Sequence, residues 1–402
     1  MRIGMILERD FPTTPPDIRV EKEARSLLRA GHEVDMLSLK ITSSEDRCWT
    51  EGIQVFRIPI PMLRIRDWEE DAVERHFHSP GSPWVTAIAD FVEKRRPDAI
   101  HVHDLPLVWS AGHVARKKGL PLVFDMHEVY PPMVRFMRNG EAGSWDTAEW
   151  VAGYEMECVQ MADRIIVVVE ESRERLLRMG VPGEKIAVVM NTEDPEKMKP
   201  TNATPSAYKH LSCKFLVTYV GTFGEIRGLE TLIEAAQRVF RQIPIHLLLV
   251  GGAYNQLDLE ALARNIGVET HVTITGWVAF ETIPDLIAMS DVCVAPHVKN
   301  AFTDATIPHK LFQYMLMGKP VIVSDANPLA RIVRECNCGL VFPSGDPEAL
   351  AGALLQLHGS EGEGERLGCR GLKAALAKYN WHTDEKNLLN LYAWLGRKNA
   401  HA

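Results

Sequence analysis

The strongest constraint on the fold is an alternation of short apolar runs with longer amphipathic segments, which continues along almost the whole chain. Short apolar runs joined by helical patterns are typical of parallel strands connected by crossover helices. We therefore predict an α/β protein with doubly wound parallel sheets. In the first half, the apolar runs are 3–7, 34–39, 55–60, 99–103, 122–125, 165–169 and 186–190, and amphipathic segments include 21–30, 84–94 and 171–179.

A polar, proline-bearing stretch after Asn191 divides this pattern into two parts. The apolar runs beyond it are 215–220, 246–250, 272–275, 292–295, 321–324 and 340–342. We predict a first domain over 1–195, a linker over 196–212, a second domain over 213–380, and a terminal helix over 381–402 that packs back on the first domain. Because ligands of such sheets bind beyond the carboxyl ends of the strands, we expect the site in a central cleft between the domains.

Composition and charge exclude several classes of protein. Of the 402 residues, 46% are hydrophobic and 24% are charged, which is the balance of a globular protein and not of a disordered one. The net charge of −8 indicates that nucleic acid is not a partner. No apolar stretch approaches the ~20 residues of a membrane span, and the first run is too short for a signal peptide, so we expect a cytoplasmic protein.

The seven cysteines lack the spacing of a zinc site or of a dense disulfide framework, and we interpret them as reduced. Cys336 and Cys338 form the only close pair in the sequence. Because no second pair accompanies them, the sequence favours a chance pair in a turn over a metal or redox site.

A glycine-rich turn between a predicted strand and a predicted helix is the first candidate binding motif. It runs from Val220 to Gly228 and includes Gly221, Thr222, Gly224 and Arg227. Exposed backbone amides, a helix N-terminus and a guanidinium together favour a bound diphosphate. A tight turn with a surface arginine fits the pattern equally well. The motif matches neither the dinucleotide fingerprint nor the Walker loop.

A second candidate lies on a helix predicted from Thr306, as N-cap, to Gly318, as stop, with Pro308 in its first turn. Thr306, Lys310 and Gln313 would share one polar face of this helix. A solvated face is the simpler interpretation. However, this face begins at a helix N-terminus, where phosphate binding is electrostatically favoured.

Histidines and carboxylates follow two strands of the first domain. One group is His101, His103 and Asp104, and the other is Asp125, His127 and Glu128. Two such strand ends suit general acid–base catalysis or substrate positioning. Hydrogen-bonded structural histidines are an equal alternative, and a metal site is a weaker one.

Taken in order, these segments resemble the retaining, nucleotide-sugar-dependent glycosyltransferases of family four, the group 1 type, which have the GT-B fold of two Rossmann-like domains. The resemblance covers nearly the whole chain. The segments that carry it are Phe11-Pro12, Arg29 to Val34, Asp98 to Asp104, Asp125 to Glu128, Asn191, Gly221 to Gly228, Leu249 to Gly252, Gly276 to Val278, Ser290 to Val292 and Lys310 to Val321.

The resemblance implies roles for individual residues. Those implied to be catalytic are His127, Arg227 and Lys310. Those implied to bind the donor are Gly221, Thr222, Gly224, Arg227, Gly251, Asp304, Thr306, Ile307, Lys310 and Gln313. Those implied to lie on the acceptor side are Asp17, Arg19, His103, Asp104 and Glu128. No metal is implied. The chain departs from the family pattern at Thr222, where a basic residue is usual, and at Ala305 and Gln313, where many members carry two glutamates.

The implied activity is the transfer of a sugar from a nucleoside-diphosphate sugar to a hydroxyl acceptor with retention of anomeric configuration, in polysaccharide, lipopolysaccharide or glycolipid assembly. The resemblance favours a UDP-sugar over a GDP-sugar as co-substrate and implies no other cofactor. A GT-B sugar-nucleotide epimerase and a catalytically weak sugar-nucleotide-binding protein are the alternatives. The acceptor would be a sugar or a lipid-linked sugar.

Residues 131–138 alternate apolar residues with two arginines, a pattern that would suit contact with the inner face of a membrane. An ordinary segment whose apolar residues pack on its own domain is the favoured interpretation.

Overall fold

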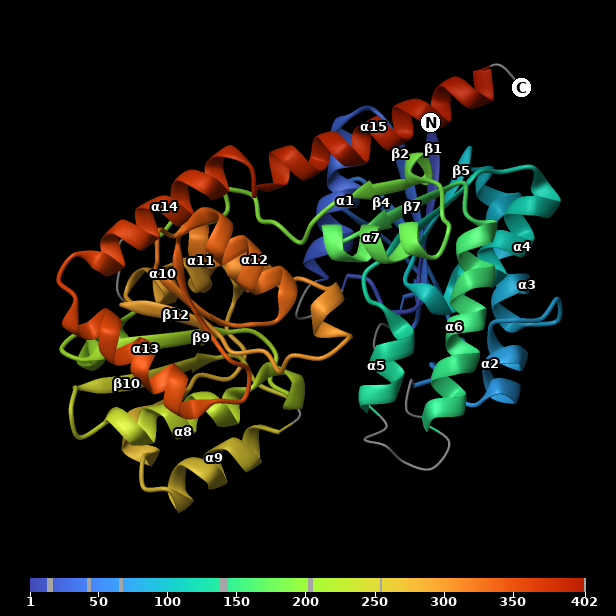
Figure 1. The fold of residues 1–402 in the computed structure, drawn as a ribbon. Coiled ribbons are helices and arrows are strands. Elements are labelled where there is room, and N and C mark those ends of the chain that lie inside the picture. Colours follow the sequence, from blue (N-terminus) through green and yellow to red (C-terminus); the bar gives the residue numbers. More distant parts are fainter. Residues whose placement is uncertain are drawn as a thin grey trace. The chain divides into compact units, whose positions relative to one another are not determined.

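The structure is a computed structural model that describes residues 1–12, 17–41, 45–64, 68–137, 144–201, 205–253 and 255–400 (Figure 1). The chain forms two compact units. Unit 1 comprises Met1–Met190 and Glu385–Ala402, and unit 2 comprises Asn191–Asp384. Residues 191–212, most of which the sequence assigned to a linker, group with unit 2.

Unit 1 is built on an eight-stranded sheet with the strand order β3-β4-β2-β1-β5-β6-β7-β8. All neighbouring strands are parallel except β3 and β4, which are antiparallel. The strands are β1 (Arg2–Leu7), β2 (Glu33–Leu39), β3 (Arg47–Thr50), β4 (Ile53–Ile58), β5 (Ala99–His103), β6 (Leu122–Met126), β7 (Arg164–Val167) and β8 (Ile186–Val188).

Helices cover the sheet of unit 1. The helices α3, α4 and α6 pack on one another at one face of this sheet (Figure 1). On α1, Asp17 is the N-cap, and its carboxylate accepts a hydrogen bond from the amide of Val20, which fixes where the helix starts. The helices are α1 (Ile18–Arg29), α2 (Glu70–His76), α3 (Pro83–Arg95), α4 (Val108–Lys118), α5 (Tyr130–Met137), α6 (Ser144–Met161), α7 (Glu170–Arg178) and the greater part of α15 (Trp381–Ala400).

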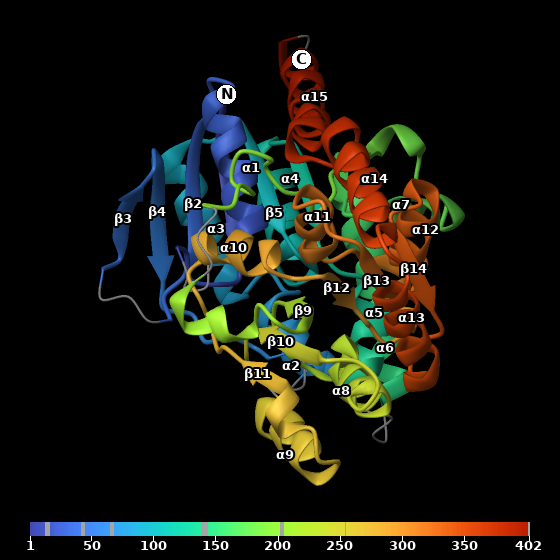
Figure 2. The same cartoon turned by 90° about the vertical axis from the view of Figure 1, so that its left-hand side faces the viewer.

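Unit 2 has a six-stranded, wholly parallel sheet with the order β11-β10-β9-β12-β13-β14. The helices α8 and α9 lie on one face, and α10 and α11 lie on the other (Figures 1 and 2). The strands are β9 (Phe215–Val220), β10 (Ile245–Val250), β11 (Val272–Ile274), β12 (Val292–Ala295), β13 (Val321–Ser324) and β14 (Gly339–Phe342). The helices are α8 (Leu229–Val239), α9 (Gln256–Asn265), α10 (Ile283–Ala288), α11 (His309–Leu316), α12 (Asn327–Cys336), α13 (Pro347–Gly359) and α14 (Glu363–Ala377).

The predicted α/β class with two parallel-sheet units is confirmed, and each predicted strand is present within two residues. One local prediction is wrong. The helix predicted from Thr306 begins at His309, because Pro308 is its N-cap and Thr306 has extended backbone (φ −140°, ψ 160°). Proline disfavours helical geometry in the residue before it, so the helix cannot extend back through Ile307. Thr306 therefore does not share a helical face with Lys310.

The glycine- and glutamate-rich stretch 359–365 contains the last residue of α13 and the first residues of α14. Gly362 has a φ of 73° and precedes the helix, and acidic residues in the first turn favour its N-terminus.

The segment with two arginines is α5, whose buried residues are Tyr130, Pro131, Met133 and Val134. Arg138, which ends the predicted segment, lies outside the described residues. Among the described residues, no helix is both long and apolar enough to cross a membrane.

Candidate active site

In both sheets, the strand order reverses direction at one point, and the candidate residues gather there. In unit 1 the reversal lies between β1 and β5, and in unit 2 it lies between β9 and β12. Loops leave the carboxyl ends of such strands in opposite directions, so a crevice opens between them. His103 ends β5, and the loop that carries Arg227 follows β9.

A buried ion pair lies at the centre of the unit 1 site. Arg19, on the first turn of α1, donates from Nε to Asp125 Oδ2 (2.9 Å) and from Nη2 to Asp125 Oδ1 (2.6 Å), and the two side chains are 3% and 0% exposed. Its Nη1 donates to the carbonyl of Val189 at 2.8 Å. Burial favours a neutral carboxyl, but Arg19 and the neighbouring histidines outweigh it and hold the pKa of Asp125 well below its usual range.

Two histidines share the same carboxylate. His103 Nδ1 lies 3.1 Å from Asp125 Oδ2, and His127 Nε2 lies 2.6 Å from the same oxygen. The other ring nitrogen of His127 lies 3.5 Å from Asp104 Oδ2. Burial lowers the pKa of His127, but the two carboxylates outweigh it and raise this pKa to about 9. At neutral pH, His127 is therefore an imidazolium that can donate hydrogen bonds and stabilise negative charge, but cannot accept a proton.

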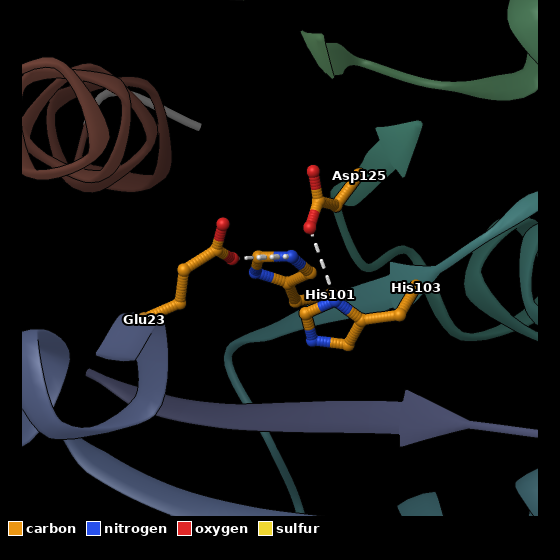
Figure 3. A group of neighbouring side chains, drawn as sticks. All are labelled: Glu23, His101, His103 and Asp125. Atoms are coloured by element: carbon orange, nitrogen blue, oxygen red, sulfur yellow. Dashed lines mark hydrogen bonds and ion pairs between the residues drawn. The ribbon is translucent and has the colours of Figure 1, made fainter. Parts of the chain in front are cut away.

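Glu23 and His101 lie next to this group (Figure 3), and Tyr392 contacts His101. His101 Nδ1 lies 2.7 Å from the hydroxyl of Tyr392 on α15, and His101 Nε2 lies 3.4 Å from Glu23 Oε2. Burial raises the pKa of Glu23 to about 8, so this carboxyl is protonated at neutral pH.

Ligand atoms of Glu23, His101, His103 and Asp125 lie within 4.8 Å of one another, a spacing that a metal ion could use. The guanidinium of Arg19 already occupies the cationic position, because it contacts both Asp125 (2.6 Å) and Glu23 (3.0 Å). A dication would have to displace it and to compete with the proton on Glu23. This group therefore serves as an internally compensated proton and charge network.

The remaining residues that the resemblance placed on the acceptor side interact with members of this network or with Arg9. Asp104 has a φ of 64°, which strains a residue with a side chain, and its Oδ1 is buried without a hydrogen-bond partner among the described residues. Asp17 caps α1 and interacts electrostatically with His127. Glu128 interacts electrostatically with Arg9.

In unit 2, two glycines bring the ends of three strands together. Gly251 has a φ of 133°, and a Cβ there would lie 2.0 Å from the carbonyl oxygen of Gly221. Gly228 has a φ of 65°, and a Cβ there would lie 2.0 Å from the carbonyl oxygen of Pro296. Larger residues would separate these loops. The turn after β9 therefore lies against the segments that follow β10 and β12, and the prediction that it leads into a helix at Leu229 is confirmed.

Three basic side chains converge at this turn. Arg227 Nη1 lies 3.3 Å from His297 Nε2, and Lys310 Nζ lies 4.7 Å from the centre of the Tyr219 ring. A Cβ on Gly221 would lie 3.2 Å from Lys310 Nζ. Lys310 and His297 are 7% and 3% exposed. Burial, followed by the charge of Arg227, lowers the pKa of Lys310 well below its usual range, and burial with both cations does the same for His297.

Within the described part of the chain, no carboxylate forms an ion pair with Arg227 or Lys310. Buried cations without counter-ions are unfavourable unless a ligand compensates them. This arrangement therefore suits an anion.

The other residues predicted to bind the sugar donor lie on α11 or in the segment before it. Gln313 Nε2 donates to Glu193 Oε1 at 3.2 Å, and His309 Nδ1 lies 3.2 Å from the same oxygen. The carbonyl of Ile307 accepts a hydrogen bond from Asn191 at 2.9 Å.

Three further residues were predicted to bind the sugar donor. Their contacts in the structure are structural ones, and none of these contacts bears on a ligand. Asp304 Oδ1 accepts from the amide of Asn327, the first residue of α12. The carbonyl of Thr222 accepts from the hydroxyl of Tyr219. Thr306 lies in extended backbone before α11.

Sequence reasoning missed Glu23, His297, Glu193 and Tyr392. His297 follows β12 as His127 follows β6, so the same pattern could have identified it. No local signal marks the other three, because the contacts of Glu23 and Tyr392 with His101, and of Glu193 with Gln313, join residues that are far apart in the sequence.

The amino-acid sequence is similar to those of known glycosyltransferases. Residues 214–360 match the family described as "Glycosyl transferases group 1", and residues 16–192 match the family described as "Glycosyl transferase 4-like domain". A D-inositol 3-phosphate glycosyltransferase of Xylanimonas cellulosilytica is 25% identical over 98% of this chain and 96% of its own. An alpha-D-kanosaminyltransferase of Streptomyces kanamyceticus is 24% identical over 70% of this chain and 73% of its own.

Solved structures share the fold. The sucrose-phosphate synthase of Thermosynechococcus elongatus has a TM-score of 0.81 at 22% identity and covers 99% of this chain and 100% of its own. The Anabaena protein HepE, solved in complex with UDP, has a TM-score of 0.72 at 16% identity and covers 98% of this chain and 100% of its own.

Proposed function

The chain belongs to the group 1 glycosyltransferases of the GT-B fold, and from this premise we propose that it transfers a sugar from a UDP-sugar to a hydroxyl acceptor with retention of anomeric configuration. The observation that carries the donor assignment is the group of three basic side chains, Arg227, His297 and Lys310, without a paired carboxylate among the described residues.

A diphosphate would supply the missing negative charge. The amides that open α8 point toward the same turn, and the partial positive charge of a helix N-terminus adds to that of the side chains. When the nucleoside diphosphate departs from the anomeric carbon, negative charge grows on the phosphate oxygens. Groups held in place by burial stabilise that charge without reorganising, which lowers the barrier. In this proposal, protein cations act on the phosphates and no metal takes part.

The uridine nucleotide is supported by HepE, which was solved with UDP. The acceptor in the proposal is a hydroxyl of a sugar or of a lipid-linked sugar in polysaccharide, lipopolysaccharide or glycolipid assembly. Retention requires that this hydroxyl enters on the face from which the diphosphate departs, so the two substrates must be held together.

His127 takes the role of a fixed cation in unit 1. Because both ring nitrogens face carboxylates, its charge is maintained near neutral pH. We assign it to stabilising and orienting the transferred sugar or the acceptor, and not to general base catalysis.

The central test measures UDP binding by calorimetry for the wild type and Arg227→Ala. Loss of a charge-assisted hydrogen bond of ~1.5–3 kcal/mol should weaken UDP binding about 10- to 100-fold. The matched control is Arg238→Ala, which removes an exposed guanidinium that lies on α8 in the same unit and pairs with Glu348. This control should leave UDP affinity unchanged.

Equal UDP affinity in the wild type and Arg227→Ala would contradict the assignment of this turn to the diphosphate. A screen of UDP- and GDP-sugars against sugar acceptors, with the anomeric configuration of the product read by NMR, tests the base and the stereochemistry. An inverted product would contradict retention, and preference for a GDP-sugar would contradict the choice of base.

A further inference from the structure

Unit 1 contains an open pocket of about 490 Å³ that is lined by none of the residues assigned to sugar transfer. The edge strand β8 lines this pocket together with the start of β7, the first turn of α7, the turn Gly183–Lys185 before β8, and α15. Pockets of about 300–1,000 Å³ are typical of sites for small molecules. The pocket is therefore large enough for a ligand the size of a substituted monosaccharide.

Three basic side chains of this pocket meet at the turn before β8. Arg164 Nη1, from the first residue of β7, donates a hydrogen bond to the carbonyl of Glu184 at 2.5 Å. Arg173 Nη2, from α7, lies 3.7 Å from the position that a Cβ on Gly183 would take. Lys185 is the last residue of the turn and lines the pocket as well. The fold therefore brings three cations from separate elements to one place.

The guanidinium of Arg164 is held in place without a ligand. The residue is 7% exposed, and its Cζ lies 3.2 Å from the centre of the Trp394 ring on α15, a contact that stabilises a cation. Within the described part of the chain, its one hydrogen bond is to Glu184, and no carboxylate forms an ion pair with it. None of its nitrogen atoms is both buried and unpaired, so its unused N–H groups reach solvent. Such groups form a planar fork that fits two oxygens of a phosphate.

The pocket is positive in a chain that is negative overall. Four basic and two acidic side chains line it, which gives a net charge of +2, whereas the whole chain carries −8. The basic residues are Arg164, Arg173, Lys185 and Arg397, and the acidic ones are Glu170 and Glu184. Among these six, the one ion pair is between Arg173 and Glu170, at 3.9 Å. A phosphate monoester, with a charge of about −1.5 to −2 at neutral pH, would balance the excess.

Neutral polar groups line the pocket beside these charges. Asn387 Nδ2 donates to the carbonyl of Val188 at 3.1 Å, and its amide oxygen can still accept a hydrogen bond from a ligand. Asn390 lies three residues farther along α15 and is exposed. Amide groups both donate and accept hydrogen bonds, as sugar hydroxyls do. The lining therefore combines groups that suit a phosphate with groups that suit hydroxyls.

We propose that this pocket binds a small phosphorylated sugar or polyol, with its phosphate against Arg164, Arg173 and Lys185 and its hydroxyls against Asn387 and Asn390. A free sugar phosphate and the head group of a phosphoinositide lipid share this chemistry. All of the lining residues belong to unit 1, whereas the basic group assigned to the diphosphate belongs to unit 2. The proposal is therefore independent of the reaction that the chain catalyses.

The test measures binding of glucose 6-phosphate to the full chain by calorimetry, in a phosphate-free buffer with saturating UDP. We expect saturable binding to the wild type, binding of inorganic phosphate that is at least about tenfold weaker, and no binding of glucose. Lys185→Met and Arg173→Met should each weaken the binding of glucose 6-phosphate about tenfold, because each removes one charged contact to the phosphate. Both side chains are partly exposed, so both variants should fold.

Lys117→Met is the matched control, because it removes an exposed lysine of α4 that lies outside the pocket. This variant should bind glucose 6-phosphate as the wild type does. Hydrogen exchange locates the site independently: glucose 6-phosphate should protect peptides from 181–188 and 386–397 in the wild type, and this protection should be lost in Lys185→Met at the same ligand concentration.

The proposal is overturned if glucose 6-phosphate shows no saturable binding to the wild type. It is also overturned if Arg227→Ala abolishes the binding while Lys185→Met leaves it unchanged, because the ligand would then occupy the basic group of unit 2. Equal affinity for inorganic phosphate would contradict the part of the proposal that concerns the sugar.

Vesicles that contain phosphatidylinositol 4-phosphate distinguish the two sources of the ligand. Cosedimentation that glucose 6-phosphate competes away and that Lys185→Met abolishes would assign the pocket to a lipid head group. Binding of glucose 6-phosphate without cosedimentation would assign it to a free sugar phosphate. Cosedimentation that Lys185→Met and Arg173→Met both leave unchanged would contradict a role of this pocket in lipid binding.

Discussion

The two candidate sites lie at equivalent places in their sheets, yet their charges are balanced in opposite ways. In unit 1, the cations Arg19 and His127 both contact Asp125, so these charges are paired within the protein itself. In unit 2, Arg227 and Lys310 converge without a carboxylate partner among the described residues. The charges of the unit 1 site are balanced by residues of the folded protein, whereas the charges of the unit 2 site require a bound anion to balance them. In the proposed function, this difference assigns the charged part of the donor to unit 2 and the neutral hydroxyl groups to unit 1.

The largest expected effect comes from removing the centre of the unit 1 network. Asp125→Ala should lower the free energy of unfolding by ~3–5 kcal/mol, because it removes the bidentate counter-ion of the buried Arg19 and a partner of two histidines. Urea unfolding followed by hydrogen exchange of unit 1 peptides measures the loss. Asp46→Ala, which breaks an exposed pair with Lys40, is the control and should change nothing measurable. A small loss in Asp125→Ala would show that the network is not a structural unit.

Removing a cation from unit 2 should have the opposite effect on stability. Lys310→Met keeps the length of the buried side chain and removes a charge that lies close to Arg227. We expect the ligand-free protein to gain ~1 kcal/mol of stability and to lose UDP affinity. Melting temperatures with and without UDP measure both, since a ligand at one hundred times its Kd adds about 2.7 kcal/mol to the wild type. A destabilised variant that still binds UDP would contradict the comparison between the two sites.

The two units should also respond to pH with opposite signs. In unit 1, the folded pKa is raised to about 9 for His127 and to about 8 for Glu23. Each therefore contributes stability that is lost as pH rises through these values. In unit 2, the pKa values of Lys310 and His297 are lowered, so their contribution improves as pH rises. From pH 7 to 9, unit 1 should lose on the order of 1 kcal/mol while unit 2 gains stability.

Hydrogen exchange of peptides from each unit, corrected for the intrinsic pH dependence of exchange, resolves the two responses. If the stability of both units changed with pH in the same direction, the proposed electrostatic difference between the two sites would be wrong.

Substitutions in the two sites should also differ in their effects on kcat and on UDP affinity. His127→Ala removes a cation in unit 1, whereas the basic residues assigned to the diphosphate belong to unit 2. We expect kcat to fall about 100-fold or more, on the scale of one lost electrostatic group, with UDP affinity changed less than threefold. His127→Lys, which keeps a positive charge, should recover part of the activity. If UDP affinity and kcat fell together, the division of roles between the units would be wrong.

The sequence predicted the sheets well because their signal is local. Strands such as β5 and β9 are short, mainly apolar runs bounded by turn residues, and their ends match the prediction residue for residue. The edge strand β3 has no such signal, because its four residues pair antiparallel with β4 and leave Trp49 70% exposed. A local pattern also misled the prediction at Thr306, where extended backbone before Pro308 delays the start of α11.

The sites were predicted only in part for a related reason. Strand ends marked Asp125, His127 and Arg227, but not the charge balance around them. That balance depends on pairs such as Arg19 with Asp125, which lie 106 positions apart, and His101 with Tyr392, which lie 291 apart. Periodicity carries no information about such distances.

The smallest expected effect concerns the surface of α5 and tests whether unit 1 also contacts a membrane. Its apolar residues Tyr130, Met133 and Val134 are buried within unit 1, which leaves Met137, 54% exposed, as the large apolar side chain on the outside. One exposed methionine and the charge of Arg135, worth ~1 kcal/mol at an anionic surface, are too little for stable attachment. We therefore expect the protein to stay in the supernatant with phosphatidylserine-containing vesicles at low salt, and Arg135→Glu to leave that distribution and the rate with a soluble acceptor unchanged. Cosedimentation that high salt or Arg135→Glu abolished would instead show that α5 forms part of a surface that binds anionic lipids.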